Sequence, residues 1–171
     1  MNHQVFIGLG SNLDNPLEQL RIALESLNAL PDTRVEKVSS FYGSTPLGPE
    51  DQPDYVNAVA ELCTTLQPSV LLDALQSIES TQGRVKKRHW GERLIDLDIL
   101  LYDDLQMQSE RLQIPHSQMA FRDFVLVPLH ELDAGLSIPG VGSIQGLIDG
   151  LKTSYLKPLV KSNLSSDVTD F

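Results

Sequence analysis

Two aspartates, Asp96 and Asp98, lie two residues apart in the apolar run IDLDILLY. Successive side chains of a β-strand point to opposite faces, so both carboxylates are predicted to share one face, with Cα atoms about 6.6 Å apart. Ile95, Leu97 and Ile99 would fill the opposite, buried face. Carboxylate oxygens are preferred ligands of hard cations such as Mg²⁺. A bare D-x-D pair is more often part of a solvated edge strand, so the pair alone only suggests a metal site.

A cluster of basic residues precedes this strand. Together with the only tryptophan, Trp90, five of the 13 Lys and Arg residues lie in one short segment: Arg84, Lys86, Lys87, Arg88 and Arg93. Mg²⁺ held by one or two carboxylates completes its shell with water and substrate phosphates, and guanidinium groups neutralise the charge of such phosphates. Because the net charge is −10, the cluster indicates a specific polyanionic ligand rather than general affinity for nucleic acid or membranes. A solvated surface loop is the plainer alternative, and composition alone favours it.

The elements that must position these residues are predicted from periodicity and turn signals. They are a strand at 4–9, a helix from Asn15 and Pro16 to Pro31 with Asn15 and Glu18 as its capping pair, strands at 34–42 and 55–66, a helix from Pro68 to before Gly83, and a strand at 93–102. This β-α-β-β-α-β order predicts an α+β, ferredoxin-like sandwich. The two long connections, 43–55 and 83–93, are uncommon unless functional or disordered.

Short additional elements are predicted after the sandwich: a small strand within 104–114, a turn at IPHSQ and a helix within FVLVPLHEL. Residues 1–160 are expected to form a single domain and residues 161–171 a polar, frayed tail. Neither a transmembrane run nor a signal peptide is recognised. The single Cys63 fits a reducing cytoplasm, and a monomer is expected. Gly8 and Gly10 complete no nucleotide-binding glycine motif, so they are interpreted as sites of close backbone packing.

These motifs together resemble the 6-hydroxymethyl-7,8-dihydropterin pyrophosphokinase family of folate biosynthesis. The family signature, a tryptophan-bearing loop followed by G-x-R-x-x-D-[LIV]-D-[LIVM], is similar to WGERLIDLDIL here. Further landmarks occur in the family's order: GLGSNL, SSFY, TPLGPEDQPDYVNA, IESTQGR, IPH, RDF and VPLHEL. The resemblance runs from about residue 4 to residue 148 and implies the ferredoxin-like fold.

The resemblance also implies roles for particular residues. Asp96 and Asp98 match ligands of two magnesium ions that bridge the phosphates of ATP, and Arg84 and Arg93 match catalytic arginines of the closing loop. Residues implied on the ATP side are Gln76, Glu79, Trp90, Ile99, Arg111, His116 and Arg122. On the pterin side, the aromatic rings of Tyr55 and Phe124 match a sandwich around the substrate, and the residues that match its polar contacts are Asn57, Ser44 and Leu47.

The implied reaction transfers pyrophosphate from ATP to the hydroxymethyl oxygen of the pterin, giving AMP and the pterin diphosphate. Such transfers depend on positioning and electrostatics, so no covalent protein nucleophile is needed. Two alternatives stay open. An RNA-binding module shares the element order, although the net charge and the lack of an RNP-like aromatic pattern argue against it. A metal-dependent phosphohydrolase would use the aspartates but would leave Tyr55 and Phe124 unexplained.

Overall fold

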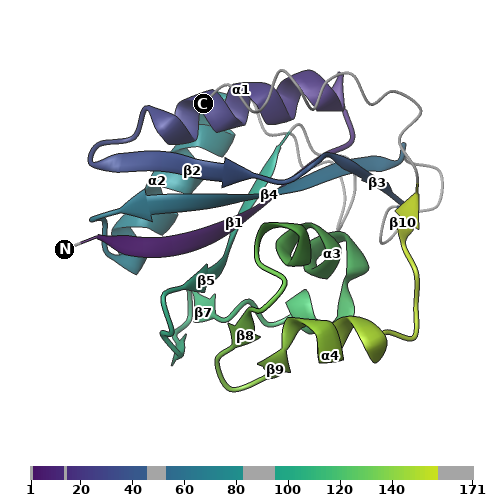
Figure 1. The fold of residues 1–171 in the computed structure, drawn as a ribbon. Helices are drawn as coiled ribbons and strands as arrows, with labels where there is room; N and C mark the ends of the chain where they lie inside the picture. Colours follow the sequence, from purple (N-terminus) through teal and green to yellow (C-terminus); the bar gives the residue numbers. More distant parts are fainter. Residues whose placement is uncertain (1, 14, 46–52, 83–94, 158–171) are drawn as a thin grey trace.

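The computed structural model describes residues 2–13, 15–45, 53–82 and 95–157 (Figure 1). Its first elements are β1 (His3–Ser11), α1 (Pro16–Asn28), β2 (Thr33–Val38), β3 (Tyr42–Ser44), β4 (Tyr55–Thr64), α2 (Pro68–Thr81) and β5 (Asp96–Tyr102). Shorter elements follow: β6 (Met107–Gln108), β7 (Gln113–Ile114), a 3₁₀ turn (Met119–Phe121), α3 (Asp123–Leu132), β8 (Ser137–Ile138), β9 (Gly142–Ser143), α4 (Ile144–Asp149) and β10 (Leu156–Lys157). The whole of the predicted 83–93 loop and the predicted tail at 161–171 lie outside the described residues.

The main sheet has the order β10-β3-β4-β1-β5, with β2 also paired to β4, and every pairing is antiparallel. Along the chain, β1, α1, β2, β4, α2 and β5 follow the β-α-β-β-α-β order. The predicted ferredoxin-like sandwich is therefore confirmed. The central strands β1 and β4 are paired along nine residues, which gives the sheet a rigid middle.

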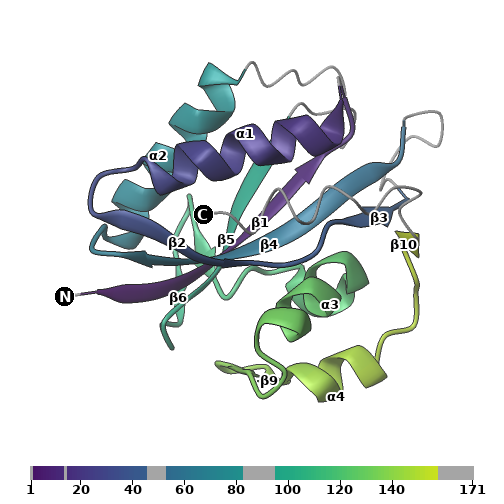
Figure 2. The same cartoon turned by 45° about the horizontal axis from the view of Figure 1, so that its top comes forward.

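Helices α1 and α2 cover one face of the sheet (Figures 1 and 2). Each begins with a proline at its first position, where the missing amide costs nothing and the fixed φ favours the helix. Their apolar residues recur at helical spacing and are buried: Leu20, Ala23, Leu24 and Leu27 in α1, and Leu71, Leu75 and Ile78 in α2. Among the described helices, none has the length and apolarity needed to span a bilayer.

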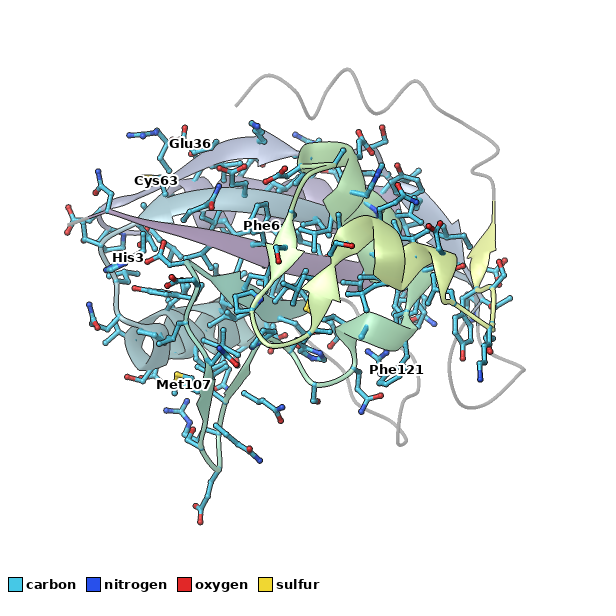
Figure 3. The ribbon with its side chains drawn as sticks, turned by 60° about the horizontal axis from the view of Figure 1, so that its bottom comes forward. His3, Phe6, Glu36, Cys63, Met107 and Phe121 are labelled. Atoms are coloured by element: carbon cyan, nitrogen blue, oxygen red, sulfur yellow. The ribbon has the colours of Figure 1, made fainter. Side chains whose placement is uncertain are left out.

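Helices α3 and α4 cover the opposite face of the sheet and enclose a second apolar cluster (Figures 1 and 2). Phe6, Leu100, Leu126 and Leu129 belong to this cluster, and each is at most 2% exposed. Figure 3 shows Phe6 in the layer between the sheet and these helices, whereas Phe121 lies at the rim, where it is 67% exposed. The sheet is thus packed on both faces.

The helix start at Pro16 is confirmed, but the predicted capping by Asn15 is wrong. Asn15 adopts a left-handed backbone conformation with φ 64°, and its side chain makes no capping hydrogen bond. A side-chain cap needs an extended backbone at this position, whereas asparagine is one of the few residues that accept the left-handed one. The backbone therefore turns into the helix without the expected side-chain bond.

The predicted strand 34–42 is in fact two strands, β2 and β3, interrupted at residues 39–41. At the interruption, the Ser40 amide donates to both carboxylate oxygens of Glu131, at 3.1 and 2.9 Å. The Ser39 hydroxyl accepts a 2.9 Å hydrogen bond from the Val59 amide. Because side chains have taken over these backbone partners, the strand ladder is broken here. The predicted small strand within 104–114 is a hairpin of β6 and β7.

Candidate active site

A pocket of about 360 Å³ lies on the face of the sheet that α3 partly covers. Its wall includes backbone and side chains of β1, β4, β5 and the start of α3. Eight residues that the sequence singled out line this one pocket: Ser44, Tyr55, Asn57, Asp96, Asp98, His116, Arg122 and Phe124. Residues that lie far apart in the chain are thus brought together.

The floor of the pocket is formed where β1 pairs with β5. In this register Asp98 lies opposite Gly8, and Asp96 lies opposite Gly10. Both aspartates line the pocket, Asp96 half-buried and Asp98 exposed, while Leu97 between them is 4% exposed in the core. The predicted common face of the two carboxylates is confirmed. Since the opposing residues are glycines, β1 presents bare backbone beside the aspartates.

A β-bulge in β5 positions His116. The register passes from Phe6–Leu101 to Ile7–Ile99 and so skips Leu100. The Leu100 carbonyl instead accepts a hydrogen bond of 3.0 Å from the His116 amide. Bulges often re-aim backbone and side chains beside active sites, and this one holds the turn that carries His116 against the pocket.

His116 and Arg122 are partly buried cationic or donor groups beside the acidic floor. The Nδ1 atom of His116 accepts a hydrogen bond of 3.2 Å from the Gln118 amide, so a neutral ring carries its proton on Nε2. Burial lowers the pKa of His116, while Asp98 opposes this shift and Arg122 adds to it. Burial likewise lowers the pKa of the Arg122 guanidinium, and Asp98 and Tyr155 oppose it.

The other end of the pocket is aromatic with a polar edge. The Asn57 amide nitrogen donates a 2.6 Å hydrogen bond to the Ser44 hydroxyl, and both residues are buried. A Cβ atom on Gly10 would lie 3.3 Å from the Asn57 Oδ1 and 3.6 Å from the Tyr55 ring, so the predicted close packing here is confirmed. The Phe124 ring lies beneath the Arg122 guanidinium, 5.7 Å from its Cζ. Few polar groups in an apolar wall are typical of a small-molecule site.

Four residues that the resemblance places on the ATP side lie outside this pocket lining. Arg111 donates to the Asp73 carboxylate at 2.6 Å and to the Gln76 side-chain oxygen at 3.3 Å on the exposed surface. Glu79 is 6% exposed, and its carboxylate accepts a hydrogen bond from the Leu97 amide. Ile99 is 2% exposed in the core beneath α1 and α2. Their roles toward ATP stay predictions.

Arg84, Trp90, Arg93 and Leu47 lie outside the described residues. Conversely, the pocket contains residues that sequence reasoning did not identify, among them Thr45, Leu100 and Gln118. Leu100 could have been inferred, since it follows Asp96 and Asp98 at strand alternation. No periodic signal marks Thr45 or Gln118, which belong to no regular element.

The described part of the chain contains no group of three or more His, Cys, Asp or Glu side chains arranged to hold a metal. The donor set that the pocket offers is the pair of carboxylates on Asp96 and Asp98. Two carboxylates fit Mg²⁺, which usually takes one or two protein carboxylates and completes its octahedron with water and substrate phosphates. They do not fit zinc, which takes three or four protein ligands, mostly nitrogen or sulfur.

Comparison with known proteins identifies close relatives. Residues 6–134 match the family described as 7,8-dihydro-6-hydroxymethylpterin-pyrophosphokinase (HPPK). The chain is 54% identical over 143 residues to the 2-amino-4-hydroxy-6-hydroxymethyldihydropteridine pyrophosphokinase of Haemophilus influenzae, covering 84% of this chain and 89% of that protein. It is 50% identical over 139 residues to the enzyme of the same name from Pseudomonas aeruginosa, covering 81% and 86%.

Solved structures agree on the fold. A crystal structure of wild-type Plasmodium falciparum HPPK-DHPS with pteroate matches at a TM-score of 0.71 and 13% identity. The match covers 87% of this chain but 44% of that one, so the present chain spans less than half of that protein. At this identity the match shows the fold alone. The matched family and the two bacterial relatives establish that the chain belongs to the 7,8-dihydro-6-hydroxymethylpterin-pyrophosphokinase family.

Proposed function

We propose that the described pocket binds 6-hydroxymethyl-7,8-dihydropterin at its aromatic end and the phosphates of ATP at its acidic end. As a family member, the chain is an ATP-dependent diphosphokinase of folate biosynthesis, which transfers pyrophosphate from ATP to the pterin's hydroxymethyl oxygen. The observation that carries the assignment of the pocket is that one cavity holds both the carboxylate pair and the two aromatic residues Tyr55 and Phe124.

The aromatic end suits a flat heterocycle. Tyr55 and Phe124 offer ring faces for stacking, and Asn57 and Ser44 offer hydrogen-bonding groups for the polar edge of a pterin. Because Asn57 and Ser44 are also hydrogen-bonded to each other, their side chains are held in place before substrate binds. Such preorganisation lowers the entropy cost of binding. Leu47, outside the described residues, is proposed to add a backbone contact.

The acidic end suits phosphates carried by a cation. Asp96 and Asp98 are proposed to hold two Mg²⁺ ions, which when bound would neutralise phosphate charge and activate the hydroxymethyl oxygen. His116 Nε2–H and the Arg122 guanidinium border the same end and can donate hydrogen bonds to phosphate oxygens. The two donors, together with the cations that the two carboxylates would hold, compensate the negative charge of a triphosphate.

In the transfer, the hydroxymethyl oxygen forms a bond to the β-phosphorus of ATP while the bond from that phosphorus to the α,β-bridging oxygen breaks, and the hydroxymethyl proton is released to solvent. AMP leaves, and the pterin carries the diphosphate. The protein holds the attacking oxygen in line and stabilises the charge on the transferred group. Arg84 and Arg93, outside the described residues, are proposed to help stabilise that charge, with Trp90 closing over the nucleotide. Gln76, Glu79, Ile99 and Arg111 complete the proposed nucleotide side.

Three further points belong to this proposal and rest on the sequence. The single Cys63 fits a reducing cytoplasm. The net charge of −10 argues against nucleic acid or an anionic membrane as a partner. The enzyme is proposed to act as a monomer on its two small-molecule substrates.

The decisive test incubates the protein with ATP, Mg²⁺ and 6-hydroxymethyl-7,8-dihydropterin and separates the nucleotide products. The proposal expects AMP that appears only when the pterin is present, in a 1:1 ratio with pterin diphosphate. Release of inorganic phosphate independent of pterin would instead support a phosphohydrolase. Absence of nucleotide turnover would support a binding module.

A further inference from the structure

Asp123 is a buried carboxylate that binds the C-terminal segment of the described chain. It is the first residue of α3, directly before Phe124, and is 6% exposed. Its Oδ2 atom accepts three hydrogen bonds: from the Ser154 hydroxyl at 3.2 Å, the Tyr155 amide at 3.0 Å and the Leu156 amide at 3.2 Å. A carboxylate at a helix N-terminus is also favoured by the helix dipole.

Tyr155 connects the two walls of the pocket. Its amide is bound by Asp123, and its ring meets the Phe124 ring edge to face, with centroids 5.8 Å apart and an interplanar angle of 83°. Its carbonyl accepts hydrogen bonds from the Thr45 amide at 2.8 Å and the Thr45 hydroxyl at 3.3 Å. One residue is therefore attached to the α3 wall and to the end of β3.

The segment continues along the same edge of the sheet. Leu156 pairs with Ser44 and Lys157 pairs with Gly43, so β10 adds a strand to β3 beside the pocket (Figure 1). Both strands are short, with two and three residues, and such short strands gain little from their own ladder. The hydrogen bonds of Asp123 therefore make a large part of the contact that holds this segment in place.

We propose that Asp123 and the segment Ser154–Lys157, here named the C-terminal latch, set the separation between Phe124 and the Ser44–Thr45 wall and thereby the fit of the pterin ring. This inference rests on the proposed function of the pocket. Asp123 acts through Phe124 and Tyr155, so it is a positioning residue rather than a catalytic one. Its loss is expected to loosen the aromatic end and to leave the two aspartates of β5 in place.

The test compares four variants with the parent by steady-state kinetics and thermal unfolding. Asp123→Ala removes the acceptor and is expected to raise the KM for the pterin about tenfold or more, with the KM for ATP changed less than about twofold. Asp123→Asn keeps one oxygen acceptor for the three donors, and its pterin KM is expected within about threefold of the parent. A pterin KM retained in Asp123→Asn would show that the hydrogen bonds of residue 123, rather than its negative charge, hold the segment in place.

Glu131→Ala is the matched control. Glu131 lies on the same helix about 12 Å from Asp123 and also accepts from three donors, the Ser40 amide, the Ser40 hydroxyl and the Tyr42 hydroxyl. The hydrogen bonds of Glu131 among the described side chains go to Ser40 and Tyr42, neither of which belongs to the latch, so Glu131→Ala is expected to lower the unfolding temperature without changing the pterin KM. A pterin KM raised equally by Glu131→Ala and Asp123→Ala would overturn the latch, since general loosening of α3 would then explain both.

Tyr155→Leu keeps the backbone bonds and removes the ring contact, which keeps the proposal testable even where Asp123→Ala does not fold. A raised pterin KM with ATP binding retained supports the latch, and an unchanged pterin KM overturns it. Turnover of the parent protein distinguishes failure of the proposed function from failure of the latch. Absence of pterin-dependent AMP in the parent removes the proposed function itself, whereas an active parent with unaffected variants removes only the latch.

Discussion

The carboxylate of Glu79 on α2 accepts a hydrogen bond of 2.8 Å from the backbone amide of Leu97, the residue between Asp96 and Asp98. β5 is the last strand in the sheet path, with β1 as its only partner strand among the described elements. An edge strand needs partners for its outward amides, and Glu79 supplies one from beneath. Through Glu79, helix α2 thus helps to hold the two aspartates in the pocket floor.

Glu79→Ala is expected to destabilise the fold by about 1–3 kcal/mol, because a buried amide loses its acceptor. It should also raise the Mg²⁺ concentration needed for half-maximal activity, since the aspartates are then held less firmly. Urea denaturation and a Mg²⁺ titration of turnover measure the two effects. Glu79→Gln keeps an acceptor oxygen and should retain most of both properties. Equal damage from both variants would show that the charge, rather than the hydrogen bond, matters.

Asp98→Ala is expected to lower turnover by at least about 1,000-fold, since the proposed cation loses a ligand beside the reacting phosphates. The fold should remain, with a change in the free energy of unfolding of about 0.5 kcal/mol or less, because Asp98 is exposed. AMP formation at saturating Mg²⁺ and circular dichroism measure these outcomes. Asp104→Ala, in the exposed turn after the same strand, is the control and should retain full turnover. Unchanged turnover in Asp98→Ala would remove the metal assignment.

Gly10→Ala is expected to weaken pterin binding about tenfold or more, because the added methyl group would crowd Asn57 at 3.3 Å and Tyr55 at 3.6 Å. Gly8→Ala is the comparison, since the nearest neighbour of its methyl group would be the flexible Leu100 side chain at 3.4 Å. Isothermal titration with the pterin and a non-hydrolysable ATP analogue measures both. A larger loss in Gly8→Ala would place the pterin elsewhere in the pocket.

His116→Ala is expected to lower kcat/KM for ATP by about 10–100-fold, the value of a hydrogen bond to a charged group. His116→Gln places an amide nitrogen near the position of Nε2 and should recover part of that loss. Initial rates at several ATP concentrations distinguish the variants from the parent. If Gln recovers nothing, Nε2–H is not the donor that contacts the phosphate.

Tyr42 gives a prediction for alkaline pH. Burial and the hydrogen bond to Glu131 raise the pKa of the Tyr42 hydroxyl above its usual value. A group whose pKa is raised by folding stabilises the fold fully below its unfolded pKa of about 10 and loses that contribution as pH rises further. Tyr42→Phe should therefore be less stable than the parent at pH 8, and the difference should shrink above about pH 10. Urea denaturation at pH 8 and above about pH 10 measures the difference in free energy of unfolding between the variant and the parent. A difference that stays constant with pH would contradict the raised pKa of Tyr42.

The parts of the fold that sequence could predict are those with a repeating pattern. The leucines of α1 recur every three or four residues, and Asp96 and Asp98 alternate with Ile95, Leu97 and Ile99, so the buried side of each element follows from spacing. Pro16 and Pro68 mark helix starts for the same local reason. These predictions needed no information about distant residues.

The latch and the bulge could not be predicted in this way. Tyr155 binds Asp123 across 32 residues and Thr45 across 110 residues, and two-residue strands such as β10 carry no period. The bulge at Leu100 depends on how β5 meets β1, which no local pattern reports. Ile99 illustrates a further limit, because its spacing predicts burial while the resemblance implies a place beside ATP. The structure shows the burial.

The two faces of the sheet differ in the side chains that they carry. The pocket-lining side chains proposed to bind substrate project from the face shared with α3, whereas the face beneath α1 and α2 is filled mainly by aliphatic residues. An aliphatic layer tolerates exchange among residues of similar total volume, as a fold retained at 13% identity and a TM-score of 0.71 requires. Thermal robustness can therefore be engineered in the aliphatic layer beneath α1, with Gln76, Glu79, Ile99 and the pocket-lining residues left unchanged.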